Sequence, residues 1–280
     1  MIRFHPTART ALSLMATGCC GLALAQEQEG TAQPLWEIGA VGLVSSQQAY
    51  PGAAERVSRG LALPYLIYRG KFLRADRGSA GLRAIKTEDM ELDVGFAGSF
   101  GSRSSEVQAR EGMPDLGTLV QFGPRLKWKL GSGPGKGRWR LELPLRGVFD
   151  LDSGLGYRGA AFEPELVFER QAEGGWSYNT SVSAIWGNHR LADTFYGVAP
   201  AYATAERAAY QASSGRIAWR LSASASHKLT PQLRVIGFAR VDSVAGAANE
   251  ASPLVQRTTG STVGLVMTYT WKQSAERAVD

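Results

Sequence analysis

Eight charged residues in the middle of the chain are spaced so that they could form one electrostatic network. They are Arg125, Lys127, Lys129, Arg140, Glu142, Arg146, Glu163 and Glu165. In a β-strand, residues two positions apart point to the same face, and opposite charges on neighbouring strands attract each other. On three adjacent antiparallel strands, the basic row of Arg125, Lys127 and Lys129 would lie beside the mixed row of Arg140, Glu142 and Arg146. The mixed row would lie beside the acidic row of Glu163 and Glu165.

The expected hairpins assign neighbours to these charges. A turn at 131–137 would bring Arg125 near Glu142 and Lys127 near Arg140, and the next hairpin would bring this mixed row near the two glutamates. Two roles are open for such a network. It either cross-links the interior of the protein as a structural ion network, or its basic residues form the anion-attracting row of a selective pore.

Catalytic chemistry is weakly supported by the residues available for it. The two histidines outside the N-terminal segment, His189 and His227, are expected at opposite ends of the fold and cannot share a site. Asp150 and Asp152 fit a polar turn better than a carboxylate pair. Segment 131–137 resembles a phosphate-binding loop, but no Ser or Thr follows its lysine and a strand comes next. We therefore expect no enzyme activity, no cofactor and no metal.

Strands must position these charges, because apolar and polar residues alternate along most of the chain. The final segment shows this best, with an apolar face made of Val263, Leu265, Met267, Tyr269 and Trp271. A period of two is the period of a strand. The same alternation recurs in 90–100, 120–130, 138–149 and 176–186.

Both a soluble β-sandwich and a transmembrane β-barrel alternate in this way. The runs here reach the about 9–11 residues that a tilted strand needs to cross a bilayer, whereas strands of soluble sheets usually have about 5–6. Small residues populate the polar face, as suits a narrow lumen. Aromatic residues such as Trp128, Trp139 and Trp176 stand at the ends of the runs, as in interfacial girdles. We therefore expect an all-β fold, a transmembrane antiparallel up-and-down β-barrel.

The connections predict the number of strands, because periplasmic turns are short, outer loops are long, and the two must alternate. This rule predicts twelve strands, with ten as the alternative. Residues 71–86 then hold two short strands with a break at Arg77-Gly78-Ser79. The longest outer loop, 188–214, carries aromatic residues that either plug the barrel or form a binding surface. The expected strands are 35–45, 59–69, 71–77, 80–86, 90–100, 117–130, 138–149, 157–169, 176–187, 215–226, 232–243 and 258–271.

The N-terminal residues predict export. Two arginines precede an apolar run that ends in Ala23-Leu24-Ala25, the pattern of a cleaved signal peptide; a lipoprotein would use Cys19, but the leucine expected three residues earlier is missing. The net charge is only +6, and no basic run suggests nucleic acid as a partner. We expect four parts: a signal peptide at 1–25, a periplasmic segment at 26–34, an outer-membrane barrel at 35–271 and a periplasmic tail at 272–280.

Several short motifs, taken in order, resemble the MltA-interacting protein (MipA)/OmpV family of outer-membrane proteins. They are Trp36-Glu37-Ile38-Gly39, Ala49-Tyr50-Pro51-Gly52, Leu63-Pro64-Tyr65, Tyr68-Arg69-Gly70 with Phe72, Thr194-Phe195-Tyr196-Gly197-Val198 and Ser252-Pro253-Leu254-Val255. The resemblance spans 35–271. It implies an outer-membrane barrel and, for the family's namesake, a non-enzymatic scaffold that joins a lytic murein transglycosylase to a murein synthase. The resemblance implies no catalytic residues. It also implies no role for the outer-loop motif Thr194 to Gly197.

The resemblance to outer-membrane barrels also concerns how the chain is inserted. Gly264, Tyr269 and Trp271 fit the C-terminal signal that the barrel-assembly machinery reads, although Lys272–Asp280 extends beyond it. The expected partners are therefore outer-membrane lipid, the assembly machinery and, from the family resemblance, the two murein enzymes.

Overall fold

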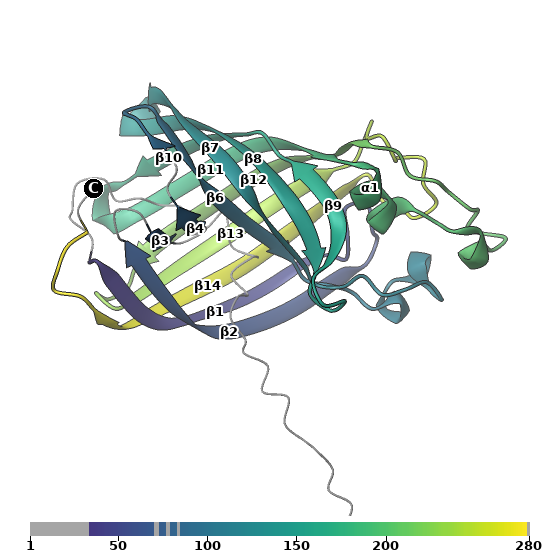
Figure 1. The fold of residues 1–280 in the computed structure, drawn as a ribbon, viewed down its shortest axis with the longest axis horizontal. Helices are drawn as coiled ribbons and strands as arrows, with labels where there is room; N and C mark the ends of the chain where they lie inside the picture. The colour runs from purple at the N-terminus through teal and green to yellow at the C-terminus, as the bar shows by residue number, and fades with distance from the viewer. Residues whose placement is uncertain (1–33, 70–72, 77–78, 83–84, 279–280) are drawn as a thin grey trace, which may run out of the picture.

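The chain folds into one antiparallel β-sheet that closes into a barrel, as the computed structural model shows (Figure 1). The structure describes residues 34–69, 73–76, 79–82 and 85–278. Its strands are β1 (Trp36–Gln48), β2 (Arg56–Arg69), β3 (Leu73–Asp76), β4 (Ser79–Leu82), β5 (Ile85–Lys86), β6 (Met90–Ser99), β7 (Leu119–Gly133), β8 (Gly137–Asp150), β9 (Gly156–Phe162), β10 (Glu165–Gln171), β11 (Trp176–Gly187), β12 (Gly215–Lys228), β13 (Leu233–Ser243) and β14 (Thr259–Gln273).

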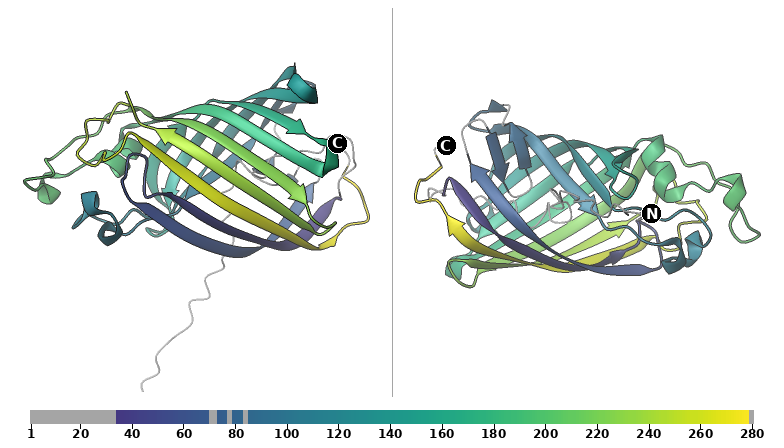
Figure 2. Two further views of the ribbon diagram at one scale, coloured as in Figure 1. Left: turned by 180° about the vertical axis from the view of Figure 1, so that it is seen from behind. Right: turned by 60° about the horizontal axis from the view of Figure 1, so that its bottom comes forward.

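Apart from β5, which pairs with β6, and from β9 and β10, which share one place in the sheet, strands that follow each other in the sequence lie next to each other, and β1 pairs with β14. The ring is complete because β8 and β11 each pair with both β9 and β10. This arrangement confirms the expected all-β fold, an antiparallel up-and-down barrel. Figure 2 shows the same closed wall from two further directions.

Alternation along the strands separates an outward apolar face from an inward one. On β14, Leu265, Tyr269 and Trp271 point outward and are exposed, with Trp271 exposed at 57%. On the opposite face of β14, Thr262 and Val266 point inward and are buried. In a membrane, the exposed apolar face meets lipid, so this pattern is the one that a transmembrane barrel requires.

Two of the expected strands are interrupted. Strands β9 and β10 together occupy the place expected for one strand at 157–169, and they are separated by Glu163 and Pro164, whose ring nitrogen carries no hydrogen for the ladder. Strands β4 and β5 both pair with β6. Of the expected turn near residue 77, Arg77 and Gly78 lie outside the described residues, while Asp76 and Ser79 pair with each other. The number twelve therefore stays a prediction.

The two ends of the barrel differ. The inner end holds the short hairpins and the paired first and last described segments. The outer end holds the long loops (Figure 1). The expected outer loop at 46–58 is shorter, because β1 continues to Gln48 and β2 begins at Arg56. Short 3-10 turns occur in the loops and hairpins at η1 (Ser104–Glu106), η2 (Gln108–Arg110), η3 (Pro134–Lys136), η4 (Glu173–Gly175) and η5 (Pro200–Tyr202).

The long outer loop contains the helix α1 (His189–Tyr196), which the alternation pattern did not predict. Its N-cap is Asn188, whose side-chain oxygen accepts a hydrogen bond from the Leu191 backbone N–H at 3.1 Å. No helix in the described part of the chain has the length and apolar character needed to cross a membrane.

The first and last segments that the structure describes meet at the inner end. The expected signal peptide at 1–25, with Cys19, lies outside the described residues, as does most of 26–34. At the other end, β14 continues to Gln273, and the backbone N–H of Leu35 donates to Glu276 O at 2.9 Å. Residues before β1 are thereby tied to the C-terminal segment.

Four residues of the family-like motifs form a joint at the inner end, here called the inner clasp: Glu37, Gly39, Tyr65 and Arg69. Arg69 is buried and pairs with Glu37 at 2.7 Å. The ring of Tyr65 lies against Gly39, and its hydroxyl hydrogen-bonds the Thr270 hydroxyl at 2.6 Å. The clasp therefore connects β2 through β1 to the last strand, where the barrel closes.

Gly39→Ala is expected to destabilise the barrel by about 1–3 kcal/mol, the usual effect of overpacking. A Cβ at Gly39 would collide with the Tyr65 ring and the Tyr269 carbonyl oxygen. Gly42→Ala on the same strand is the matched control, because a Cβ there meets nothing within 4 Å. Urea unfolding of the two variants in detergent micelles measures the difference. Equal stability of both variants would show that the close approach is not needed.

Candidate functional site

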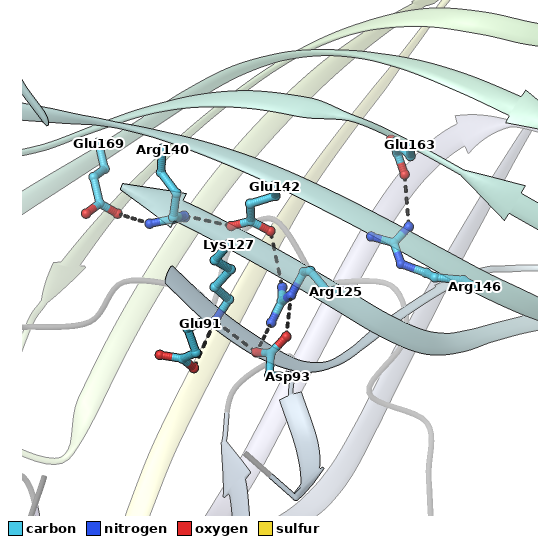
Figure 3. Close-up of polar contacts among 9 residues, drawn as sticks. All are labelled: Glu91, Asp93, Arg125, Lys127, Arg140, Glu142, Arg146, Glu163 and Glu169. Atoms are coloured by element: carbon cyan, nitrogen blue, oxygen red, sulfur yellow. Dashed lines mark hydrogen bonds and ion pairs between the residues drawn. The ribbon is translucent and has the colours of Figure 1, made fainter. Parts of the chain in front are cut away.

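The inside of the barrel holds an ion network centred on Arg125 of β7 (Figure 3). Its guanidinium donates to both carboxylate oxygens of Asp93 on β6, at 2.9 and 2.7 Å, and to Glu142 on β8 at 3.3 Å. The Arg125 side chain is only 5% exposed. A two-oxygen contact of this kind fixes the guanidinium in one plane, so three neighbouring strands are linked through one side chain.

The network extends to both sides of this centre. On one side, Lys127 lies 3.0 Å from Asp93 and 3.8 Å from Glu91. On the other side, Arg140 donates to Glu142 at 2.8 Å and to Glu169 on β10 at 2.8 Å. Every charge in this group therefore has a partner of opposite sign, as Figure 3 shows.

A second group of ion pairs lies on the neighbouring strands. Arg146 of β8 pairs with Glu163 at 3.0 Å, and Glu163 also accepts from Arg220 of β12 at 2.9 Å. Arg220 in turn pairs with Asp242 of β13 at 2.7 Å, and Arg240 lies 3.3 Å from the same carboxylate. The two groups together connect six of the barrel strands from the inside, with Glu163 bridging two of them from the break between β9 and β10.

The pairing differs in part from the neighbours that a simple turn at 131–137 predicts. Arg125 does reach Glu142, but Lys127 lies opposite Glu142 and Lys129 lies opposite Arg140. The reason is that the strands continue to Gly133 and Gly137, and that a β-bulge follows Lys129. The tight hairpin, in which Gly133 pairs with Gly137, moves the pairs away from the expected ones, and the bulge shifts them back by only one residue.

The two glutamates of the acidic row have different surroundings. Glu163 pairs with Arg146 and Arg220 rather than with Arg140, whose second partner is Glu169. Glu165 is buried and lies opposite Glu142 in the β8–β10 ladder, the neighbour that the alternation predicts.

Several members of the network were not singled out from the sequence: Glu91, Asp93, Glu169, Arg220 and Asp242. All stand at alternate, inward positions of strands whose apolar faces point outward. Period-two spacing was therefore a signal that could have found them. Their partners could not be assigned, because the contacts depend on the register of the strands. Asp93 lies directly opposite Arg125 and Asp242 directly opposite Arg220, whereas Glu169 reaches Arg140 diagonally.

Above the charged lumen, one apolar cluster spans the outer end of the barrel, and it is here called the outer cap. Its loop members are Ala49, Tyr50, Ala53, Val107, Met113, Leu116, Leu191, Ala192, Tyr196, Val198, Ala212, Val244 and Leu254. These residues pack against inward side chains at the outer ends of β2, β7, β8, β9, β11 and β12, for example Val57 and Val148. Because these strands surround the mouth, the cluster crosses the barrel from wall to wall.

Hydrogen bonds connect three separate loops inside the outer cap. The Tyr50 hydroxyl donates to Leu254 O at 2.7 Å, and the Tyr196 hydroxyl donates to Pro51 O at 3.0 Å. The Ser252 hydroxyl donates to Tyr196 O at 2.8 Å. Tyr50, Tyr196 and Ser252 thus form a closed set of contacts from segments up to 204 positions apart.

Burial sets the electrostatics of the two tyrosines. It raises the pKa of the Tyr50 hydroxyl and of the Tyr196 hydroxyl well above the ordinary value of 10.0. Both groups therefore stay protonated at any physiological pH and remain hydrogen-bond donors. The Arg110 guanidinium lies 5.8 Å from the centre of the Tyr50 ring, a cation–π distance.

The structure places the outer-loop motif Thr194, Phe195, Tyr196 and Gly197 at the C-terminal end of α1. Only Tyr196 is fully buried, at 1% exposure, while Phe195 packs against the edge of the outer cap. The Thr194 hydroxyl donates to Arg190 O within the helix at 2.9 Å. Gly197 ends the helix, and a Cβ there would collide with the Asp193 side chain.

No catalytic or metal centre is evident in the described part of the chain. It contains no group of three or more His, Asp or Glu side chains that could hold a metal ion. His189 begins α1 at the outer end, whereas His227 stacks on Trp176 near the inner end, with 4.8 Å between ring centres. Asp150 binds Arg158 in the outer turn at 2.6 Å.

Comparison with known proteins identifies relatives at the family level. The family profile of MltA-interacting protein MipA matches residues 38–271. No curated protein matches this sequence.

Solved structures of similar shape are outer-membrane proteins, all at low sequence identity. An outer membrane channel from Pseudomonas putida F1 has 10% identity and a TM-score of 0.42, with 88% of this chain and 99% of that chain covered. OmpT of Vibrio cholerae has 6% identity and a TM-score of 0.37, with 89% of this chain and all of that chain covered.

Proposed function

Because this chain belongs to the MltA-interacting protein (MipA) family of the bacterial outer membrane, we propose that it is a non-enzymatic scaffold of the cell envelope. The observation that carries the proposal is the pairing of the charges inside the barrel. Ion pairs join neighbouring strands of the wall from the inside, and the outer cap crosses the mouth. A barrel whose inward charges are paired and whose mouth is capped suits anchoring better than transport.

The docking face of this scaffold is its inner end, since peptidoglycan and the enzymes that act on it lie in the periplasm. That end presents the hairpin turns at 134–136, 173–175 and 229–232, together with the C-terminal segment. The family name points to a murein transglycosylase as one partner, and the resemblance adds a murein synthase as the second. The barrel would hold both enzymes at the outer membrane.

Capture of partners from cells tests this proposal. Crosslinking of the tagged protein, followed by affinity purification and mass spectrometry, is expected to enrich a lytic transglycosylase and a murein synthase over an unrelated barrel. Replacement of Lys136 and Arg170, which are exposed at the inner end, should weaken that capture. Replacement of the exposed outer-loop residues Arg103 and Arg257 is the matched control. Recovery of only the assembly machinery and common lipoproteins would contradict the scaffold role.

Conductance separates the scaffold from the alternative, a narrow channel for small solutes or ions. Arg125, Lys127 and Lys129 would be the anion-attracting row of such a channel, yet Arg125 and Lys127 pair with carboxylates inside the barrel. Purified protein in a planar bilayer is therefore expected to show no steady ohmic current. A current whose ion selectivity changes in the Arg125→Glu or Lys127→Glu variant would favour the channel.

A further inference from the structure

We propose that three outward-facing arginines at the outer end, Arg56, Arg190 and Arg216, bind the phosphate groups of lipid in the outer leaflet of the membrane. They are here called the rim arginines. Arg56 begins β2, Arg190 lies in the first turn of α1, and Arg216 is the second residue of β12. All three therefore lie where the apolar outer wall meets the loops, the level at which lipid headgroups surround a barrel.

Two of the rim arginines lie over aromatic rings of the membrane-facing wall. The Arg190 guanidinium is 5.5 Å from the centre of the Tyr157 ring, and the Arg216 guanidinium is 5.2 Å from that of Trp219. Both rings are exposed on the outside of the wall, Tyr157 at 44% and Trp219 at 46%. An arginine stacked on an outward aromatic ring is held flat against the wall and keeps donors at its edge for an anion.

The third rim arginine is fixed by hydroxyl and carbonyl groups. Arg56 donates to Ser46 O at 3.0 Å on the adjacent strand β1 and to Ser261 O at 2.7 Å on the next strand, β14. Arg216 is oriented in the same way by Gly246 O at 2.6 Å. These contacts position each guanidinium without neutralising its charge.

Charge balance is what points to an anion. Among the described residues, none of the rim arginines forms an ion pair with a carboxylate, in contrast to Arg125, Arg140 and Arg220 in the lumen. A positive charge at the edge of a bilayer is costly unless it reaches the headgroup region. Phosphate is the anion present there, and a guanidinium can bind it through two parallel hydrogen bonds.

A row of aromatic rings also places the level of the rim arginines at the membrane–water boundary. Outward rings of Phe96, Phe122, Phe149 and Tyr157 follow one another across β6 to β9, with centres 6.1, 4.9 and 5.5 Å apart. The row ends at Arg190. Aromatic girdles of barrels lie at the membrane–water boundary, so the arginine at its end lies beside headgroups rather than beside acyl chains.

The test uses the folded barrel in zwitterionic detergent, with diphosphoryl lipid A as the probe and dephosphorylated lipid A as the comparison lipid. Native mass spectrometry measures the lipid that each barrel retains. The wild-type protein is expected to prefer the phosphorylated lipid by about tenfold or more, because only this lipid offers the guanidinium groups a charged hydrogen-bond acceptor. Equal retention of both lipids would overturn the proposal without any variant.

The triple variant R56Q/R190Q/R216Q is expected to lose most of this preference. The matched control, K136Q/R170Q/K272Q, removes the same charge from exposed residues at the inner end and should keep the preference. Heat-dependent mobility in gel electrophoresis checks that all proteins are folded. An unchanged preference in the triple variant, or an equal loss in the control, would show that the rim arginines are not the binding groups.

Discussion

Tyr196→Ala is expected to loosen the outer cap and to leave the barrel wall folded. The Tyr196 ring is buried among the loops. Its hydroxyl donates a hydrogen bond to Pro51 O, and its backbone carbonyl accepts one from the Ser252 hydroxyl. Truncating a buried aromatic side chain costs about 3–5 kcal/mol, and here the loss falls on loops that the cap helps to keep together. Hydrogen–deuterium exchange should therefore rise sharply in segments 49–55 and 252–257.

Two further variants sharpen this result. Tyr196→Phe removes only the hydroxyl, so its effect should be close to the about 1 kcal/mol that a typical hydrogen bond contributes. Tyr202→Ala truncates a half-buried tyrosine at the edge of the same cluster and serves as the matched control. If Tyr196→Ala changed exchange no more than Tyr202→Ala, Tyr196 would not be the residue that holds the three loops together.

The second large effect is expected at the centre of the lumen. Arg125→Met should destabilise the barrel by about 3–5 kcal/mol, because removing one partner of a buried ion pair leaves charge uncompensated. The carboxylates concerned are those of Asp93 and Glu142. Urea unfolding in detergent micelles, followed by tryptophan fluorescence, measures the loss.

Two further variants separate the effect of the uncompensated charge on stability from the effect of the lost side-chain volume. The double variant Asp93→Leu/Arg125→Met removes a charge from each side, and it should recover part of the lost stability. Arg170→Met, at an exposed position of β10, controls for the substitution itself and should stay within about 0.5 kcal/mol of wild type. A loss below about 1 kcal/mol for Arg125→Met would mean that water, rather than carboxylates, solvates this guanidinium.

If the expected results for Tyr196→Ala and Arg125→Met are both found, two separate structures stabilise the barrel: the outer cap and the ion network in the lumen. The outer cap is a set of loops that local contacts keep in place, and the lumen network is part of the wall itself. A scaffold needs the lumen network for rigidity, while the outer cap excludes material from outside. The inner end then remains as the surface that the periplasm meets.

Period-two alternation was sufficient to predict strands, the closed barrel and the side of each strand that faces lipid. This succeeded because the direction of a side chain on a strand is a local property, set by the backbone geometry of adjacent residues. The expected strand at 90–100 compares with β6 at Met90–Ser99, and that at 138–149 compares with β8 at Gly137–Asp150. Alternation also placed Arg125 and Glu142 on the same inward face.

Which charges touch, and which loops meet, was decided by the tertiary structure. The position of the tight hairpin, in which Gly133 pairs with Gly137, set the register, so Lys127 lies opposite Glu142 instead of beside Arg140. Lys127 binds Asp93 on the other neighbouring strand, β6. Nothing local indicates that Tyr196 reaches Pro51, 145 positions away. Alternation depends on neighbours in the chain, whereas these contacts depend on the closure of the whole barrel, which brings distant loops together only once all of its strands are in place.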